Sequence, residues 1–116
     1  SAPFHCALMQ PAAHVMAEAL AAVPIAKPTL PVVVNVRAEA VMEPDRILDL
    51  LIAQVTGSVR WRESVLWMEK AGVTEFWEIG AGKALSGMIK RTAANATTRA
   101  IGTPPDIAAL TAWGHR

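Results

Sequence analysis

The sequence predicts an α/β fold in which helices flank a mostly parallel sheet. A continuous β-branched run at 30–36 lies between prolines and a charged stretch, which is typical of a strand buried on both faces, as in parallel sheets. A second, short strand is expected at 75–79, with Gly80 at its exit and a helix over about 82–93 beyond it. Strand, turn and helix in this order are characteristic of α/β proteins.

The first half of the chain contributes two predicted helices around the strand at 30–36. A helix is expected over 11–22, because Pro11 suits a first helical turn and Pro24 ends the apolar pattern. Pro44 then opens a second helix, and Gly57 is placed to cap it. The expected buried stripes are Val15, Met16, Ala19, Leu20 and Val23 in the first helix, and Ile47, Leu48, Leu51, Ile52 and Val55 in the second.

The second half predicts two further helices and a last strand besides the strand–turn–helix unit. Ser58 can act as the N-cap of a helix over 59–71, which ends at Gly72. A short strand at 99–101 and a terminal helix at 105–113 complete the pattern.

Composition limits the classes of function. The 116 residues allow one domain with its own core, but 53% hydrophobic and 18% charged residues are unusually apolar for a free-standing domain of this size. Some of that apolar surface is therefore expected to meet a partner. Eleven basic and ten acidic residues give a net charge of +1 without a charge run, so nucleic acid is not an expected ligand.

Location, metals and cofactors follow from a few residues. A single cysteine, Cys6, fits a reducing compartment, and the cytoplasm is expected. Charged residues and prolines interrupt the apolar stretch at 12–36 well short of the ~20 residues of a membrane span, so no membrane partner is expected. His14 and His115 have no further ligand at suitable spacing. No metal and no cofactor are predicted.

A histidine stands in a turn near the N-terminus. His5 lies between Pro3 and Pro11, just ahead of the first predicted helix, and such connections often carry catalytic groups. A histidine can take a proton from a hydroxyl and pass it on near neutral pH. Taken alone, His5 is better explained as a surface or capping residue beside an ordinary turn. The adjacent Cys6 is expected to be a buried spectator, because sequence neighbours on a turn or strand point apart.

Four separated blocks of sequence resemble one family in the right order. They are Ser1-Ala-Pro-Phe-His5-Cys-Ala-Leu-Met9 with Pro11-Ala-Ala, Pro31-Val-Val-Val-Asn35-Val, Gln54-Val-Thr-Gly-Ser-Val-Arg-Trp61, and Glu78-Ile-Gly-Ala-Gly-Lys83-Ala-Leu85. Together they are similar to the C-terminal portion of malonyl-CoA:acyl-carrier-protein transacylases, in register from Ser1 to about Arg91.

The resemblance implies roles for two residues. In this family an elbow serine attacks the malonyl thioester, a histidine activates the serine, and an arginine holds the malonyl carboxylate. The histidine matches His5. Gln54 matches a segment that orients the histidine, where a side-chain or backbone carbonyl accepts the imidazole N–H and fixes its tautomer. The alternative for Gln54 is a solvent-facing helix residue.

The resemblance also implies what surrounds the chain. Residues 1–116 would form the C-terminal part of the large subdomain of an α/β-hydrolase-like acyltransferase core, and the elbow serine and the arginine are absent. We therefore expect a fragment, or one chain of a cleaved enzyme, whose partners are the serine-bearing N-terminal segment, malonyl-CoA and acyl carrier protein. The implied activity is malonyl transfer through an acyl-serine intermediate in fatty acid biosynthesis. The alternatives are a non-catalytic binding or assembly module and a thioesterase.

The loop from Gly80 to Lys83 also invites a phosphate-binding interpretation. Glycine-rich turns at a helix N-terminus expose N–H groups. A Walker loop, however, needs Ser or Thr where Ala84 stands and glycine where Trp77 stands. The loop is therefore expected to be a tight turn that lets the following helix pack closely on the sheet.

Overall fold

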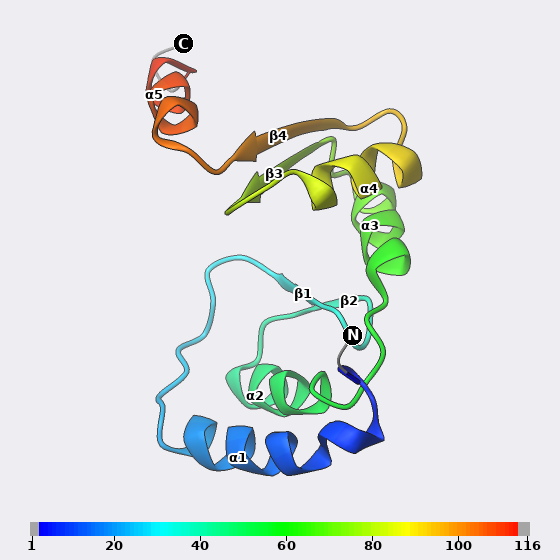
Figure 1. The fold of residues 1–116 in the computed structure, drawn as a ribbon, viewed down its shortest axis with the longest axis vertical. Coiled ribbons are helices and arrows are strands. Elements are labelled where there is room, and N and C mark those ends of the chain that lie inside the picture. Colours follow the sequence, from blue (N-terminus) through cyan, green and yellow to red (C-terminus); the bar gives the residue numbers. More distant parts are fainter. Residues whose placement is uncertain (1–2, 114–116) are drawn as a thin grey trace. The chain divides into compact units, whose positions relative to one another are not determined.

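The computed structural model describes residues 3–113, with side chains up to residue 111. Its contacts divide the chain into two units, Ser1–Ser64 and Val65–Arg116, which we call unit 1 and unit 2 (Figure 1). His115 lies outside the described residues.

Unit 1 combines a helix pair with a small hairpin. Helix α1 packs on α2, strand β1 pairs antiparallel with β2, and α2 also contacts β1 (Figure 1). The buried apolar residues of this unit are Ala13, Val34, Ala38, Ile47 and Leu50. In order, its elements are the 3-10 helix η1 (Ala7–Met9), α1 (Gln10–Ala21), β1 (Val32–Val34), β2 (Glu39–Val41) and α2 (Pro44–Ala53), after which α3 (Trp61–Lys70) leads into unit 2.

The apolar run at 30–36 differs from its prediction. Only Val32–Val34 is strand, and it pairs antiparallel with β2, so the expectation of a parallel strand buried on both faces is wrong for this run. Val32 and Val34 lie on the same face of β1, and this face is covered only toward the end of the strand, because Val32 is 39% exposed and Val34 is buried. The chain reverses at Ala38, which has a φ of 52° and donates its N–H to the Val34 carbonyl at 2.9 Å.

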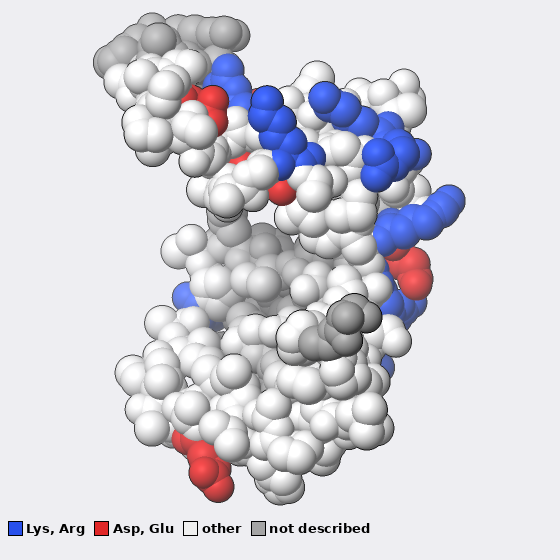
Figure 2. Space-filling view, viewed as in Figure 1, with Lys and Arg blue, Asp and Glu red and all other residues white. Residues whose placement is uncertain are grey.

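The predicted stripe of α1 does not lie in the core. Ala13 is the buried residue of this helix, whereas Val15, Met16 and Val23 are 67%, 42% and 53% exposed. On the face of unit 1 shown in Figure 2, most of the surface carries no charged side chain. Unit 1 thus presents apolar side chains that the described chain leaves uncovered.

The turn after α2 brings Gly57 against the hairpin. A Cβ on Gly57 would lie 2.6 Å from Val36 Cγ2 and 3.0 Å from the Ala53 carbonyl oxygen, so a side chain would need neighbouring atoms to shift. Gly57 is absent from the described residues with positive φ, so it does not form the predicted left-handed cap. Ser58 does not cap α3 either, because the first helical bond runs from the Ser64 N–H to the Arg60 carbonyl.

Unit 2 confirms the predicted α/β arrangement. Gly72 ends α3 with a φ of 103°, and strand β3 (Glu75–Ile79) then pairs in parallel with β4 (Thr97–Ile101). The intervening helix α4 (Ala84–Thr92) packs on both strands, and α5 (Pro104–Trp113) follows β4 (Figure 1). Val65, Phe76, Ile89, Ala93 and Ile101 are the buried apolar residues of this unit.

No helix within residues 3–113 has both the length and the apolar character needed to cross a membrane.

Candidate active site

His5 occupies a constrained bend ahead of η1. Its backbone has a φ of 56°, a left-handed conformation that is uncommon for residues other than glycine and is often found at functional sites. The Cys6 thiol donates to the Pro3 carbonyl at 3.1 Å, and the Met9 N–H donates to the Cys6 carbonyl at 3.0 Å. Cys6 is half-buried rather than fully buried as predicted, and its sulfur is engaged in this bend.

The imidazole of His5 contacts a backbone carbonyl from a distant part of the chain. His5 Nδ1 lies 2.9 Å from the carbonyl oxygen of Gln54, 49 residues further on. A carbonyl oxygen can only accept, so Nδ1 must carry the proton in this hydrogen bond. In the neutral ring, Nε2 then keeps its lone pair. The sequence left open whether the side chain or the backbone of Gln54 makes the contact, and the structure shows the backbone.

The position of Gln54 explains why its carbonyl is available. Gln54 follows the last residue of α2, and its own N–H donates to the Leu50 carbonyl at 3.0 Å. The final carbonyls of a helix have no intrahelical partner. The Gln54 oxygen can therefore accept from His5 without breaking a helical hydrogen bond.

With His5 as the base that the resemblance implies, replacing Gln54 by alanine is expected to cause only a small loss of acyl-transfer turnover. The substitution removes the side chain but leaves the carbonyl that contacts His5. The loss should stay far below the ~10²-fold typical of a missing general base. Steady-state kinetics of Gln54→Ala, measured on the chain together with a serine-bearing segment, check this, and a loss of ~10²-fold would show that the side chain carries the role.

The glycine loop of unit 2 is a tight turn, and the N–H groups at the N-terminus of the helix that follows it already have an acceptor. Gly80 and Gly82 have φ values of 141° and 84°. The Glu78 carboxylate accepts the Leu85 N–H at 3.2 Å and the Ser86 N–H at 2.9 Å, and the Ser86 hydroxyl also donates to it, at 2.8 Å. A phosphate would need these same donors. The tight-turn interpretation is therefore favoured over a phosphate site.

The same hydrogen bonds, led by that of the Ser86 N–H, hold the pKa of Glu78 below its ordinary value. A depressed folded-state pKa stabilises the fold above the ordinary value and loses that effect as the pH falls through the folded value. The Glu78 contacts should therefore weaken in acid, below about pH 4.5.

A second loop closes on the first at the carboxyl ends of the parallel strands. The Gly80 N–H donates to the Ile101 carbonyl at 3.0 Å, and a Cβ on Gly102 would collide with the Gly80 carbonyl. Asp106 accepts the N–H groups of Gly102 and Thr103, each at 3.0 Å, and the Gly102 bond is the main reason that the pKa of Asp106 is lowered. The backbone N–H groups at this edge of unit 2 thus already donate to two carboxylates of the same unit, Glu78 and Asp106.

Within residues 3–113, no three His, Cys, Asp or Glu side chains gather closely enough to hold a metal ion.

Comparisons with known proteins find relatives over nearly the whole chain. No protein-family model matches the sequence. The malonyl CoA-acyl carrier protein transacylase of Escherichia coli strain K12 is 41% identical over 109 residues, which are 94% of this chain and 35% of that protein. Its namesake from Synechocystis is 37% identical over 110 residues, 95% of this chain and 38% of that protein. The chain is homologous to the C-terminal portion of malonyl CoA-acyl carrier protein transacylases.

Solved structures of this transacylase family agree. The acyl-carrier-protein-S-malonyltransferase of Bartonella henselae superposes with a TM-score of 0.90 at 45% identity, covering 98% of this chain and 37% of that protein. A malonyl-transacylase solved in complex with a type II PKS acyl-carrier protein gives a TM-score of 0.85 at 37% identity, covering 96% of this chain and 36% of that protein. The chain spans little more than a third of the length of these transacylases. The α/β fold class is therefore confirmed.

Proposed function

We propose that the chain supplies the proton-transfer part of an acyltransferase that moves a malonyl group from coenzyme A to the thiol of acyl carrier protein. The single observation that carries the proposal is the hydrogen bond between His5 Nδ1 and the Gln54 carbonyl at 2.9 Å. It leaves Nε2 with the lone pair that a general base needs. The names of the similar proteins, which are malonyl transacylases acting on acyl carrier protein, supply the substrates.

In this proposal His5 acts in both halves of the reaction. Its Nε2 takes the proton of a serine hydroxyl as the serine oxygen bonds to the thioester carbon, and the proton then passes to the departing thiolate of coenzyme A. In the second half, Nε2 takes the proton of the acceptor thiol, the thiolate attacks the acyl-serine ester, and the proton returns to the serine oxygen. The neutral Gln54 carbonyl holds the ring throughout, with less charge stabilisation than an aspartate would give.

The proposal places the nucleophilic serine on a segment other than residues 1–116 and includes that segment as a partner. Residues 1–116 then form the C-terminal part of the large acyltransferase subdomain. The exposed apolar side chains of unit 1 support this. More than half of the side chain is exposed in Val15 on α1, in Val23 just after α1 and in Leu30 before β1. Large uncovered apolar patches usually mark an interface. A cytoplasmic location is part of the same proposal.

Mass spectrometry of the reacting protein tests the function. The chain is prepared together with its serine-bearing segment and mixed with malonyl-CoA, and the expected result is one malonyl group on the serine-bearing segment. Addition of acyl carrier protein should then move the group to the carrier. Release to water instead would indicate a thioesterase, and the absence of any acylated protein would favour the non-catalytic module.

A further inference from the structure

The turn between β1 and β2 contacts the segment that follows Gln54. The Asn35 carbonyl accepts the Arg60 N–H at 2.9 Å, and the Arg37 carbonyl accepts a hydrogen bond from the Arg60 guanidinium at 3.3 Å. Val36 lies between these two residues in the sequence. A Cβ added to Gly57 would be only 2.6 Å from Val36 Cγ2. Three consecutive residues of one turn therefore contact the segment 57–60.

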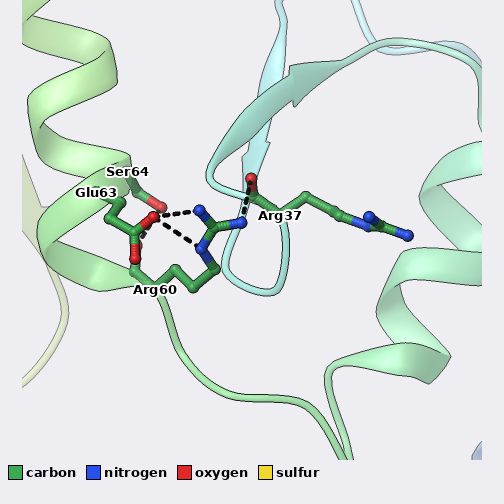
Figure 3. A network of polar contacts seen from close by, with 4 residues as sticks. All are labelled: Arg37, Arg60, Glu63 and Ser64. Atoms are coloured by element: carbon green, nitrogen blue, oxygen red, sulfur yellow. Dashed lines mark hydrogen bonds and ion pairs between the residues drawn. The ribbon is translucent and has the colours of Figure 1, made fainter.

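Arg60 is the centre of these contacts (Figure 3). Its guanidinium donates from Nη1 to the Arg37 carbonyl, and from Nε and Nη2 to one carboxylate oxygen of Glu63. Its own carbonyl accepts both the N–H and the hydroxyl of Ser64, at 2.9 Å and 2.8 Å. The hydrogen bond and charge of Arg60 also lower the pKa of Glu63. One side chain thus joins the hairpin turn to the first turn of α3.

The consequence concerns the carbonyl that His5 contacts. The segment from Gln54 to Arg60 is held at its start by α2, where the Gln54, Val55 and Gly57 N–H groups donate to carbonyls of that helix. At its end it is held by the Arg60 contacts. A peptide carbonyl changes direction when either end of a short segment moves, and small misplacements of reacting groups are costly.

We propose that Arg60 is a positioning residue for proton transfer, which fixes the segment 54–60 so that the Gln54 carbonyl stays aimed at His5 Nδ1. This inference rests on the proposed function for its kinetic effect, but its structural claim concerns the imidazole alone. The fork of Arg60 is essential, because it holds Glu63 and the Arg37 carbonyl at the same time. A lysine is a point charge without that geometry.

The test combines kinetics with nitrogen NMR of histidine-labelled protein, using the chain with its serine-bearing segment. In Arg60→Ala, kcat should fall by roughly 10-fold with little change in KM, because positioning rather than binding is lost. The neutral imidazole of His5 should change from the Nδ1–H tautomer to a mixture of both tautomers. Arg60→Lys should keep most of this defect.

Arg62→Ala is the matched control. Arg62 is an exposed arginine two residues further along the same chain, and its removal should leave both kcat and the tautomer unchanged. An Arg60→Ala protein with wild-type kcat and an unmixed Nδ1–H tautomer would overturn the inference, as would full recovery in Arg60→Lys. If Arg60→Ala does not fold, Arg60→Lys alone decides by the same two readouts.

The two proposals fail in different ways. Full activity in His5→Ala would remove the proposed function, and the tautomer of His5 would still decide the role of Arg60. An inactive His5→Ala beside an unaffected Arg60→Ala would remove the positioning role alone.

Discussion

His5→Ala is expected to slow malonyl transfer by at least ~10²-fold, the usual scale for loss of a general base. The reason lies in the geometry of the ring, since His5 Nδ1 is held by the Gln54 carbonyl at 2.9 Å and Nε2 is the nitrogen left to accept a proton. Both half-reactions use that nitrogen in the proposed mechanism. Rapid-quench measurement of serine acylation and of transfer to the carrier should therefore show both steps slowed.

His14→Ala provides the control for this measurement. His14 is an exposed histidine on α1, so its replacement tests whether the loss of any histidine from unit 1 lowers the rate. The His14 variant should react at the wild-type rate. Wild-type turnover in His5→Ala would contradict the assignment of His5 as the base.

Residues 1–116 by themselves are expected to aggregate or fold loosely and to transfer no malonyl group. The described chain contains two separate sheets of two strands each, contacted by α2 and α4. Two-stranded sheets alone are marginal in water, so each depends on its helix packing. Their outer edges offer unpaired N–H and C=O groups to other chains. Met16 and Val23 add exposed apolar surface.

Co-expression with the serine-bearing segment should restore both solubility and activity. Size-exclusion chromatography and thermal melting follow the first property, and the acyl-transfer assay follows the second. The control is co-expression with a serine-bearing segment whose nucleophilic serine is replaced by alanine, which should restore solubility without activity. A monomeric product of residues 1–116 that melts cooperatively without a companion would contradict the prediction.

Unit 2 could be predicted well because local signals decide its elements. Gly72 and Gly80 adopt the positive φ values that glycine accommodates best. They lie just after the ends of α3 and β3. Unit 1 was harder. The run at 30–36 is equally compatible with a buried parallel strand and with one arm of a hairpin, and the deciding turn is formed by Ala38, a residue type that gives no turn signal.

The exposure of α1 could not be read from its pattern. Helical spacing of Val15, Met16 and Val23 identifies an apolar face but not the segment that covers it, and the described chain leaves that face open. At the site, the resemblance pointed to His5 and Gln54, and the structure brings them together. The Arg60 contacts were missed, because hydrogen bonds to the carbonyls of Asn35 and Arg37 depend on backbone positions that carry no side-chain signature.

An acceptor built from the main chain is hidden from mutagenesis. All twenty amino acids share the carbonyl that His5 contacts at residue 54, so a deep mutational scan would record this position as tolerant even where the contact matters. Tolerance in such a scan is then no measure of an atom's importance. Chemical synthesis can alter this oxygen, since an ester in place of the 54–55 amide weakens it as an acceptor and leaves the side chain of residue 54 unchanged. The same ester removes the Val55 N–H that donates to the Ile52 carbonyl at 3.2 Å, so an ester at the 55–56 linkage is the matched control.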